Sequence, residues 1–373
     1  MSKAAELAKI GEVATNSQIG GRRNIIINGA MQVAQRGTSA TGLGAETSLL
    51  LDRFSFGAGS TAGRATMSQV ADVHDGFANA LKLDCTTADT SIAANEQAYV
   101  IYKFEGQELQ QLKKGTSGAE KMTLSFYVKG NAAATYTAEF YDADNNRHIA
   151  QEFSVTTDWN RITLTYVGDT TGAYDDDNAL SVYLFIWLHA GSNFTSGTFV
   201  SNTWASLSQT IRVGDNQTSF FDSTNRTFFI TGVQMEVGSV ATSFEHRSFG
   251  EELALCQRYY QRVQGATGAA YKRIARGHNW ATTGQDSNFI LAGEMRAFPT
   301  LVTTGTASNY GVYHANTLTA ASAVPALGSL SDAGVGNLVA LTVTVGSGLT
   351  VGQGSVLLFN NSATAFLAAD SEL

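Results

Sequence analysis

Met122-Thr-Leu-Ser-Phe-Tyr-Val-Lys129 is apolar at every second position, so that Met, Leu, Phe and Val alternate with Thr, Ser, Tyr and Lys. Side chains of a β-strand point alternately to its two faces, and this period of two predicts a strand with one face in a core. The next residues, Gly130 and Asn131, accept the backbone conformations that tight turns require. We therefore expect a half-buried strand that ends in a turn.

The same alternation recurs through residues 23–249, in segments such as 136–140 and 162–166. Clusters of Asn, Asp and Gly separate these segments, and we expect one of them, residues 142–146, to form a hairpin turn. Many short strands without intervening helices indicate an antiparallel sandwich or jelly roll. The chain is therefore predicted to be mainly β, with a jelly-roll domain over residues 23–249.

Helical patterns occur on both sides of this predicted domain. Residues 3–10 are Ala-rich and predict a short helix within an N-terminal peptide of residues 1–22. Residues 251–262 begin with two glutamates and end with Arg258 and Arg262, the charge order that favours the helix dipole. We expect a linker helix over residues 250–264, followed by a second β-domain over residues 265–373.

Composition limits the partners that the chain can have. It contains 24 Lys and Arg against 32 Asp and Glu, for a net charge of −8, whereas phosphate-backbone binding needs clustered Lys and Arg. The longest apolar runs fall far short of the roughly 20 residues that span a bilayer. We expect no nucleic-acid partner, no membrane insertion, and two isolated buried thiols at Cys85 and Cys256.

Charge is distributed unevenly along the chain. After Arg296 the charged residues are Asp332, Asp370 and Glu372, with no Lys or Arg. An isolated domain usually keeps a charged surface for solubility. We therefore expect copies of the chain to cover much of the C-terminal domain, and a monomeric domain with a Thr, Ser and Asn surface is the alternative.

The sequence carries no recognisable catalytic motif. Gly-x-Ser-x-Gly, His-Glu-x-x-His, P-loop and Cys-x-x-Cys patterns are all missing, which predicts a non-enzymatic protein without a cofactor. Asp175, Asp176 and Asp177 place three carboxylates in one loop and are weak candidate ligands for a structural calcium ion. Because calcium needs six to eight fixed oxygens, we favour the alternative of a solvated acidic loop.

Ser181-Val-Tyr-Leu-Phe-Ile-Trp-Leu-His189 holds a candidate binding surface. One face of this predicted strand is aliphatic and belongs in the core, which leaves Tyr183, Phe185 and Trp187 as an aromatic row with a spacing of about 6.6–6.8 Å. The apolar faces of pyranose rings pack on aromatic rings, so the row can bind sugars. Burial under a loop or against a neighbouring protomer is the alternative that we favour.

Several segments resemble a domain found in bacteriophage tail fibre and receptor-binding proteins. Thr157-Asp-Trp-Asn-Arg-Ile-Thr-Leu-Thr165 also resembles the central strand of carbohydrate-binding-module jelly rolls. The fibre-like segments are Asn24-Ile-Ile-Ile-Asn-Gly-Ala-Met-Gln-Val-Ala-Gln-Arg-Gly37, Leu51-Asp-Arg-Phe54, residues 229–247 and Glu251-Glu-Leu-Ala-Leu-Cys-Gln-Arg-Tyr-Tyr-Gln-Arg262. Together the resemblance covers residues 22–265.

This resemblance implies a virion tail fibre protein, made in the host cytoplasm, that mediates host attachment by binding surface glycans. It also implies a homotrimer whose residues 1–22 dock on other virion proteins of the tail or its adaptor. Carbohydrate modules of this type often hold a structural calcium through a Glu shortly after the Asn-Gly pair, where this chain has Gln32. Tethering three copies would multiply weak sugar contacts.

Aromatic residues of the C-terminal domain, Trp280, Tyr310 and Tyr313, are further candidate sugar contacts. Two other functions remain open. One is a structural virion protein, such as a head fibre, decoration protein or tail connector, without receptor binding. The other, which we rank lower, is a depolymerase tailspike, which would need a pair of carboxylates in a groove.

Overall fold

The computed structural model describes Lys3 and residues 23–44, 48–328 and 337–373. The predicted N-terminal helix therefore lies outside the described residues, apart from Lys3. The chain divides into two compact units, Met1–Glu252 together with Leu373, and Leu253–Glu372. We call the first the jelly-roll unit and the second the C-terminal unit, and each is described by itself.

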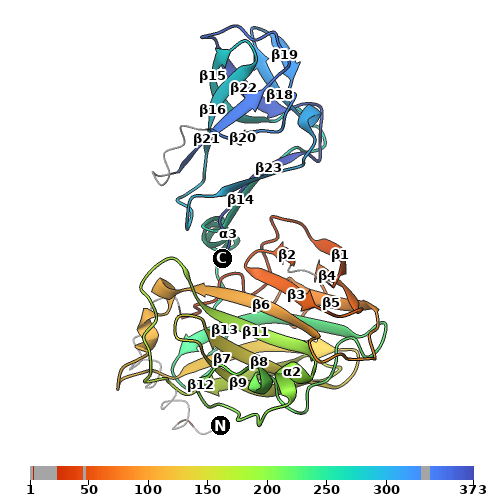
Figure 1. Cartoon of the computed structure of the whole chain (residues 1–373), viewed down its shortest axis with the longest axis vertical. Helices are drawn as coiled ribbons and strands as arrows, with labels where there is room; N and C mark the ends of the chain where they lie inside the picture. The colour runs from red at the N-terminus through yellow and green to blue at the C-terminus, as the bar shows by residue number, and fades with distance from the viewer. Residues whose placement is uncertain (1–2, 4–22, 45–47, 329–336) are drawn as a thin grey trace. The chain divides into compact units, whose positions relative to one another are not determined.

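Two antiparallel sheets build the jelly-roll unit, which runs from red to green in Figure 1. The six-stranded sheet has the order β1 (Ser39–Leu43), β4 (Arg64–Val70), β5 (Ala80–Thr87), β13 (Thr227–Val237), β7 (Met122–Gly130) and β10 (Asn160–Tyr166). The seven-stranded sheet has the order β12 (Ala205–Ser206), β9 (Arg147–Val155), β8 (Ala134–Asp142), β11 (Leu180–Ala190), β6 (Gln97–Glu105), β3 (Phe54–Gly59) and β2 (Ser48–Leu51). This confirms the mainly β, antiparallel jelly-roll prediction.

The core of the unit lies between these sheets. Leu124, Phe126 and Val128 of β7 have no exposed surface, and Leu184 and Ile186 of β11 belong to the same cluster. The alternation read from residues 122–129 thus places its apolar face in the core, as predicted. Burying one such side chain stabilises the fold by about 1.5–3 kcal/mol.

Turn chemistry also follows the prediction at the β8–β9 hairpin. Asp142 accepts a hydrogen bond from the backbone amide of Asn145 at 3.1 Å. Asn146 has a φ of 52°, in the left-handed region that Asn tolerates better than most residues. The expected hairpin turn at residues 142–146 is therefore confirmed.

A glycine in β13 permits close packing on the outer side of the six-stranded sheet. The pairing of β13 with β7 shifts register between Thr231 and Gln234, and Gly232 adopts a φ of 61° there. A Cβ atom on Gly232 would lie 2.6 Å from the Phe77 ring. Neither the backbone conformation nor the available space suits another residue at this position.

The linker helix is shorter than the sequence predicts. Helix α3 spans Phe249–Gln257 and begins at a capping box, in which Ser248 and Glu251 exchange hydrogen bonds between side chain and backbone. Residues Tyr260–Gln264 form strand β14 instead of continuing the helix, because they pair with β23 (Phe366–Asp370). The expected helix over 250–264 is corrected accordingly.

The C-terminal unit, teal to blue in Figure 1, is built from two further antiparallel sheets around its own core. Its three-stranded sheet has the order β14, β23 and β17 (Thr300–Thr303). Its seven-stranded sheet has the order β19 (Thr317–Ala320), β18 (Tyr310–His314), β22 (Gly354–Phe359), β15 (Arg273–Ala281), β16 (Gly284–Ile290), β21 (Leu338–Thr344) and β20 (Ala326–Leu327).

Helical turns make a small contribution to the described chain. They are η1 (Gly106–Glu108), η2 (Gln110–Leu112), α2 (Ser192–Thr195), η3 (Gln209–Ile211) and η4 (Ala307–Asn309). Among the described residues, no helix combines the length and the apolar character needed to cross a membrane. Cys85 and Cys256 are both buried, as expected, and burial raises the pKa of the Cys85 thiol to about 11.

Candidate functional site

The outer face of the seven-stranded jelly-roll sheet carries an aromatic cluster. Alternate residues of β11 point into the core, and the others point to the opposite face of the sheet. The register places Tyr183 beside Tyr141 of β8, and Trp187 beside Tyr99 of β6. We call the cluster the aromatic face, and its members are Tyr99, Tyr141, Tyr183, Phe185 and Trp187.

The rings of this face form a nearly parallel series at one end. The ring of Tyr183 lies 5.7 Å from that of Tyr141 at 11°, and 5.2 Å from that of Phe185 at 17°. Tyr99 meets Phe185 and Trp187 edge-on, at 4.9 and 5.0 Å. Such contacts fix ring orientation, because aromatic pairs prefer offset or edge-to-face geometry.

A chain segment covers the other end of the face. Residues 191–218, which include α2, bring Phe194 and Val213 onto Trp187 and Phe185. As a result, Trp187 has no exposed surface and Phe185 is 7% exposed. Their nomination as sugar contacts is corrected, because these rings cannot meet a ligand outside this chain. Tyr183 is half-buried and keeps an exposed part.

Glu139 anchors this cover from the same face of the sheet, where it pairs with Phe185. The carboxylate has no exposed surface and accepts hydrogen bonds from Arg212 at 2.9 Å and from the Trp187 indole at 2.8 Å, with His148 at 3.1 Å. Burial alone would raise the pKa of Glu139, but the Arg212 charge and these hydrogen bonds hold it below its ordinary value.

The guanidinium of Arg212 also lies over the aromatic face. Its central carbon is 5.0 Å from the centres of the Phe185 and Trp187 rings and 5.5 Å from that of Tyr141. A cation placed over an aromatic ring is attracted by its negative face. Arg212 thus lies over the covered end of the face and also reaches the Tyr141 ring.

Two tyrosines of the site escaped the sequence reading. Tyr99 and Tyr141 are half-buried members of the face on β6 and β8. Each occupies an outward position in the period of two, next to buried residues such as Tyr102 and Phe140. The alternation of these strands was therefore the available signal, but only the sheet order brings Tyr141 beside Tyr183 and Tyr99 beside Phe185 and Trp187.

The candidates in the C-terminal unit differ in exposure. Trp280 is 55% exposed, whereas Tyr310 has no exposed surface and donates a hydrogen bond to the carbonyl of Phe366. Tyr310 is corrected as a sugar contact because it is part of the core. Tyr313 is half-buried, and its hydroxyl donates to the Asn316 side chain at 3.1 Å.

The acidic loop does not form a cation site. Asp177 accepts a hydrogen bond from the amide of Ala179, while the backbone amide of Asp175 donates to Asp144. Asp175, Asp176 and Asp177 are exposed. Across the described parts of the chain, no group of three or more His, Cys, Asp or Glu residues could hold a metal ion.

A lysine neutralises the buried carboxylates near that loop. The Lys114 ammonium lies 2.7 Å from Asp142 and 3.2 Å from Asp169, and donates to the carbonyls of Thr171 and Gly172 at 2.8 Å. Burial alone would raise the pKa of Asp169, but its hydrogen bonds and the Lys114 charge keep it below the ordinary value. An ammonium ion thus balances these carboxylates.

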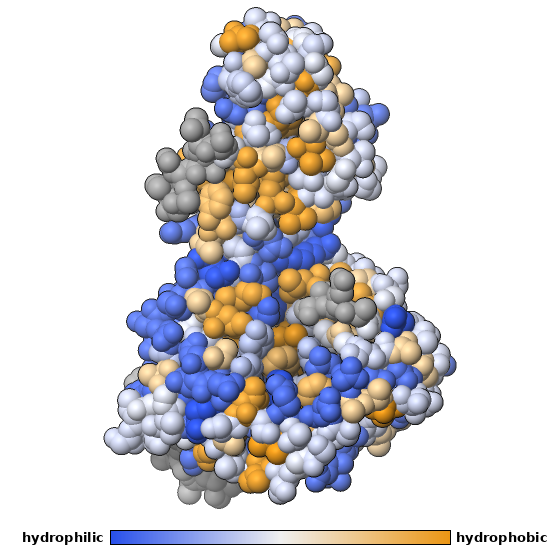
Figure 2. Space-filling view, viewed as in Figure 1, coloured by the Kyte–Doolittle hydropathy of each residue, from blue (hydrophilic) through white to orange (hydrophobic). Residues whose placement is uncertain are grey.

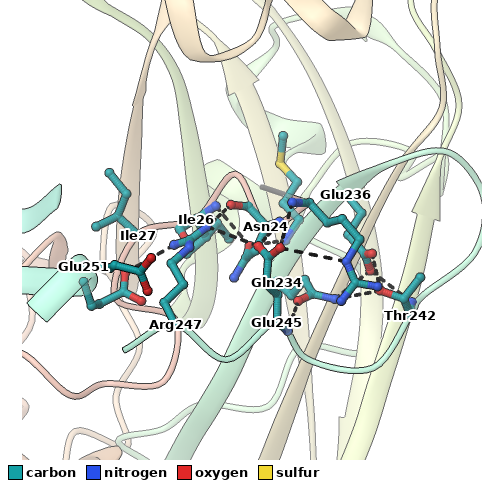
Figure 3. Close-up of polar contacts among 12 residues, drawn as sticks. Asn24, Ile26, Ile27, Gln234, Glu236, Thr242, Glu245, Arg247 and Glu251 are labelled. Atoms are coloured by element: carbon teal, nitrogen blue, oxygen red, sulfur yellow. Dashed lines mark hydrogen bonds and ion pairs between the residues drawn. The ribbon is translucent and has the colours of Figure 1, made fainter. Parts of the chain in front are cut away.

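The fibre-like segments at the two ends of the jelly roll meet in one polar junction (Figure 3). The Asn24 side chain donates to the carbonyl of Val233 at 3.1 Å. Its oxygen accepts from the backbone amides of Ile26 at 3.0 Å and Met235 at 3.1 Å. One amide group thereby fixes the first residues of the domain to its last strand.

Arg247, which follows the last strand of the jelly-roll unit, belongs to the same junction. Its guanidinium donates to the carbonyls of Asn24 and Ile26 and lies 3.5 Å from Glu245 (Figure 3). It also lies 3.3 Å from Glu252. Each of these groups is partnered within the chain. These junction residues therefore hold the two ends of the jelly-roll domain together.

The comparisons with known proteins name no family. No family model matches the chain, and no curated protein matches it. Among solved structures, it is similar to a CBM4 module at 13% identity and TM-score 0.31, over 56% of this chain and 97% of that one. It is also similar to the CBM22-1 xylan-binding domain of Paenibacillus barcinonensis Xyn10C, at 11% identity and TM-score 0.30, over 60% and 100%.

A phage structure is similar at the same level. The enzymatically active domain of bacteriophage CBA120 tailspike protein 4 is 14% identical with TM-score 0.30, over 57% of this chain and 21% of that one. Similarity this low carries no argument about function. Any proposal about function therefore rests on the residues of the aromatic face.

Proposed function

We propose that this chain is a virion fibre protein that attaches a bacteriophage to its host by binding cell-surface glycans. The observation that supports this most is the half-buried group of Tyr99, Tyr141 and Tyr183 on the outer face of a jelly-roll sheet. Two of these rings are nearly parallel, at 11°. Sugar rings stack on such surfaces through their apolar faces.

The same tyrosines supply polar groups for sugar hydroxyls. Burial raises the pKa of Tyr99 and of Tyr183, so both phenols stay protonated at neutral pH and can donate hydrogen bonds. The Lys103 ammonium lies 5.9 Å from the centre of the Tyr183 ring and adds a cation beside it. A stacking surface edged by donors fits a polyhydroxylated ligand better than an apolar one.

Binding without cleavage is the second part of the proposal. Glycoside hydrolysis needs two carboxylates that can reach the scissile bond. Glu139 is enclosed by Arg212, His148 and Trp187, and Glu152 is bonded to both the backbone and the side chain of Asn216. Both carboxylates beside the aromatic face therefore have structural partners.

A homotrimer is the third part, and the surface of the C-terminal unit supports it. Ile290 and Leu338 face each other across β16 and β21 and are 69% and 51% exposed, so they form an exposed apolar patch, and Val351 is 58% exposed. Figure 2 shows mostly white and orange atoms on the visible face of this unit. A chain that sediments as a monomer at micromolar concentration would remove this part of the proposal.

The test measures adsorption of the labelled full chain to a panel of bacterial strains. We expect saturable binding to a subset of strains, and loss of binding after periodate oxidation of their surface sugars. The double variant Tyr141→Ala/Tyr183→Ala should bind about 30-fold more weakly, since an aromatic anchor at an interface is worth about 2 kcal/mol. Tyr271→Ala is the matched control, because Tyr271 is 53% exposed and belongs to the other unit.

Two results would contradict the proposal. Equal adsorption of the double variant and of wild type would exclude the aromatic face as the receptor site. Absence of binding to every strain, with no effect of the protein on phage infection, would favour a structural virion protein. Reducing sugar released from bacterial envelopes by wild-type protein would favour a depolymerase.

A further inference from the structure

An exposed tryptophan lies on the outer face of the seven-stranded sheet of the C-terminal unit. Trp280 of β15 is 55% exposed, although tryptophan side chains are highly buried on average. Its ring lies against Gly284 of β16, where a Cβ atom would be 2.4 Å from the ring. The glycine therefore lets the indole rest on the neighbouring strand, which supports the ring while much of its surface stays open to solvent.

Polar side chains continue this face along β15 and β16. The residues of β15 that alternate with Trp280 are exposed, and those between them are buried or half-buried, so the exposed set points away from the core. His278 pairs with Asp286, and Arg276 pairs with Asn288, which places these side chains next to one another on the outer face. We call this set the outer strip, and its members are Arg276, His278, Trp280, Asp286 and Asn288.

The polar members of the outer strip have no partner within the protein. Among the described residues, none of their side chains makes a hydrogen bond or an ion pair. Asp286 is half-buried and the other members are exposed, so these groups lie where a ligand can reach them. The Arg276 guanidinium is thus a free donor and the Asp286 carboxylate a free acceptor on neighbouring strands.

A hollow on the same face adjoins the outer strip. It measures about 510 Å³, is open to solvent, and is lined by residues 313–316 and 354–356. Gly354 pairs with His278, and because glycine has no side chain, the space beside the imidazole stays open. The half-buried ring of Tyr313 lies on the other side of this space. The strip and the hollow therefore form a continuous accessible surface.

The chemistry of this surface favours one kind of ligand. Nucleic acid needs clustered Lys and Arg, whereas the strip holds one Arg beside one Asp. A second copy of the chain would bury both charges, and burying a charge without a partner is costly. Sugar hydroxyls both donate and accept hydrogen bonds, so they can pair with a guanidinium, a carboxylate, an amide and an imidazole alike. The apolar face of a sugar ring packs on an indole ring.

We propose that the outer strip binds a short oligosaccharide. One sugar ring stacks on Trp280, and the hydroxyls of the next pair with Asp286 and Arg276. The strip extends roughly 13 Å along β15, which is longer than one sugar ring. This is a second glycan site, on the other unit of the chain, and it does not depend on the aromatic face.

The first test probes a glycan array with the labelled full chain. Trp280→Ala should bind at least about tenfold more weakly than wild type, whereas Trp280→Phe keeps an aromatic ring and should lose less. Asp286→Asn should also weaken binding, because it removes a carboxylate acceptor. Tyr271→Ala is the matched control, since Tyr271 is 53% exposed in the same unit, and it should bind like wild type. Wild type that binds no glycan, or Trp280→Ala that binds like wild type, would overturn the proposal.

The second test separates this site from the aromatic face. The double variant Tyr141→Ala/Tyr183→Ala should keep residual binding on the array, and adding Trp280→Ala should abolish it. A double variant with no residual binding would overturn the second site and leave the aromatic face in place. A double variant that binds like wild type would remove the aromatic face and support the outer strip.

The third test locates the contact by chemical modification. N-bromosuccinimide oxidises accessible indole rings, and Trp280 is exposed whereas Trp159 and Trp204 are half-buried. A glycan that the double variant retains should protect Trp280 in wild type, as measured by peptide mass spectrometry, and should leave Trp159 and Trp204 unchanged. Undiminished oxidation of Trp280 at saturating glycan would overturn the proposal. Trp280→Ala that sediments as a smaller assembly than wild type would also overturn it, by assigning this face to a contact between copies.

Discussion

Two buried polar groups in this chain have opposite environments. Glu139 of the jelly-roll unit accepts hydrogen bonds from Arg212 and Trp187 and lies 3.1 Å from His148. The side-chain amide of Gln285 in the C-terminal unit has no hydrogen-bond partner among the described residues. The comparison teaches that burial alone does not identify a binding group. A partnered buried group holds the fold, whereas an unpartnered one lowers its stability.

Replacing the partnered group, Glu139, should have the largest effect on the free energy of unfolding. Glu139→Leu leaves the Arg212 guanidinium buried without its carboxylate, and we expect a loss of about 3–5 kcal/mol in the free energy of unfolding. Urea denaturation of the full chain measures it. Asp215→Asn, at an exposed carboxylate of the same covering segment, should change the free energy by less than about 0.5 kcal/mol. A Glu139→Leu loss below about 1 kcal/mol would show that the network is not a support.

The next effect concerns the other partnered charge, Lys114. Lys114→Met removes the ammonium between Asp142 and Asp169, and we expect a loss of about 3 kcal/mol, because both carboxylates stay buried. Asp169 keeps Arg147 at 2.7 Å, which limits the loss. Lys113→Met is the matched control, since Lys113 is exposed and pairs on the surface with Glu120. Equal stability of the two variants would contradict this assignment.

Replacing the unpartnered side chain of Gln285 should raise the free energy of unfolding instead of lowering it. Gln285→Leu removes polar atoms that have no partner, and we expect a gain of about 1 kcal/mol in the free energy of unfolding. The same urea series measures it. A loss larger than about 1 kcal/mol would mean that Gln285 supports the fold, and the contrast with Glu139 would fail.

The smallest effect is a pH dependence in the jelly-roll unit. His189 has no exposed surface and lies 2.7 Å from Ser219 and 3.0 Å from Glu96. Burial lowers the pKa of His189 below its ordinary 6.5, so the unfolded chain binds a proton that the folded chain binds only at lower pH. Stability from this group is complete above pH 6.5 and is lost as the pH falls through the folded pKa.

Thermal unfolding at pH 7.5 and pH 5.5 checks this sign. Wild type should lose stability at the lower pH, and His189→Gln should lose less, because Gln cannot take up the proton. A larger loss in the variant would contradict the direction of the pKa shift. The exposed His246 serves as the control position, with His246→Gln expected to follow wild type.

Local pattern accounts for much of the fold. The alternation of residues 122–129 became β7, and the Asp142–Asn146 cluster became a hairpin turn. The end of α3 could not be read locally, because Tyr260–Gln264 becomes a strand through pairing with Phe366–Asp370, far along the chain. Partners distant in sequence decide such boundaries.

The candidate site was harder to read than the fold. Tyr183 was found from its own strand, but the covering segment 191–218 has no regular period that would show where it lies. It buries Trp187, and this decides which end of the aromatic face remains open. The buried polar side chains of Gln285 and Ser287 were missed because they resemble the outward residues of an ordinary strand. Only the register and the burial together place them inside.

The most direct test of the account is a glycan array probed with the labelled full chain. We predict binding to a restricted set of glycans, at least about tenfold weaker for Tyr141→Ala/Tyr183→Ala than for wild type and unchanged for Tyr271→Ala, with no glycan cleaved. Wild-type protein that binds no glycan above background, or a double variant that binds the same set equally well, would contradict it.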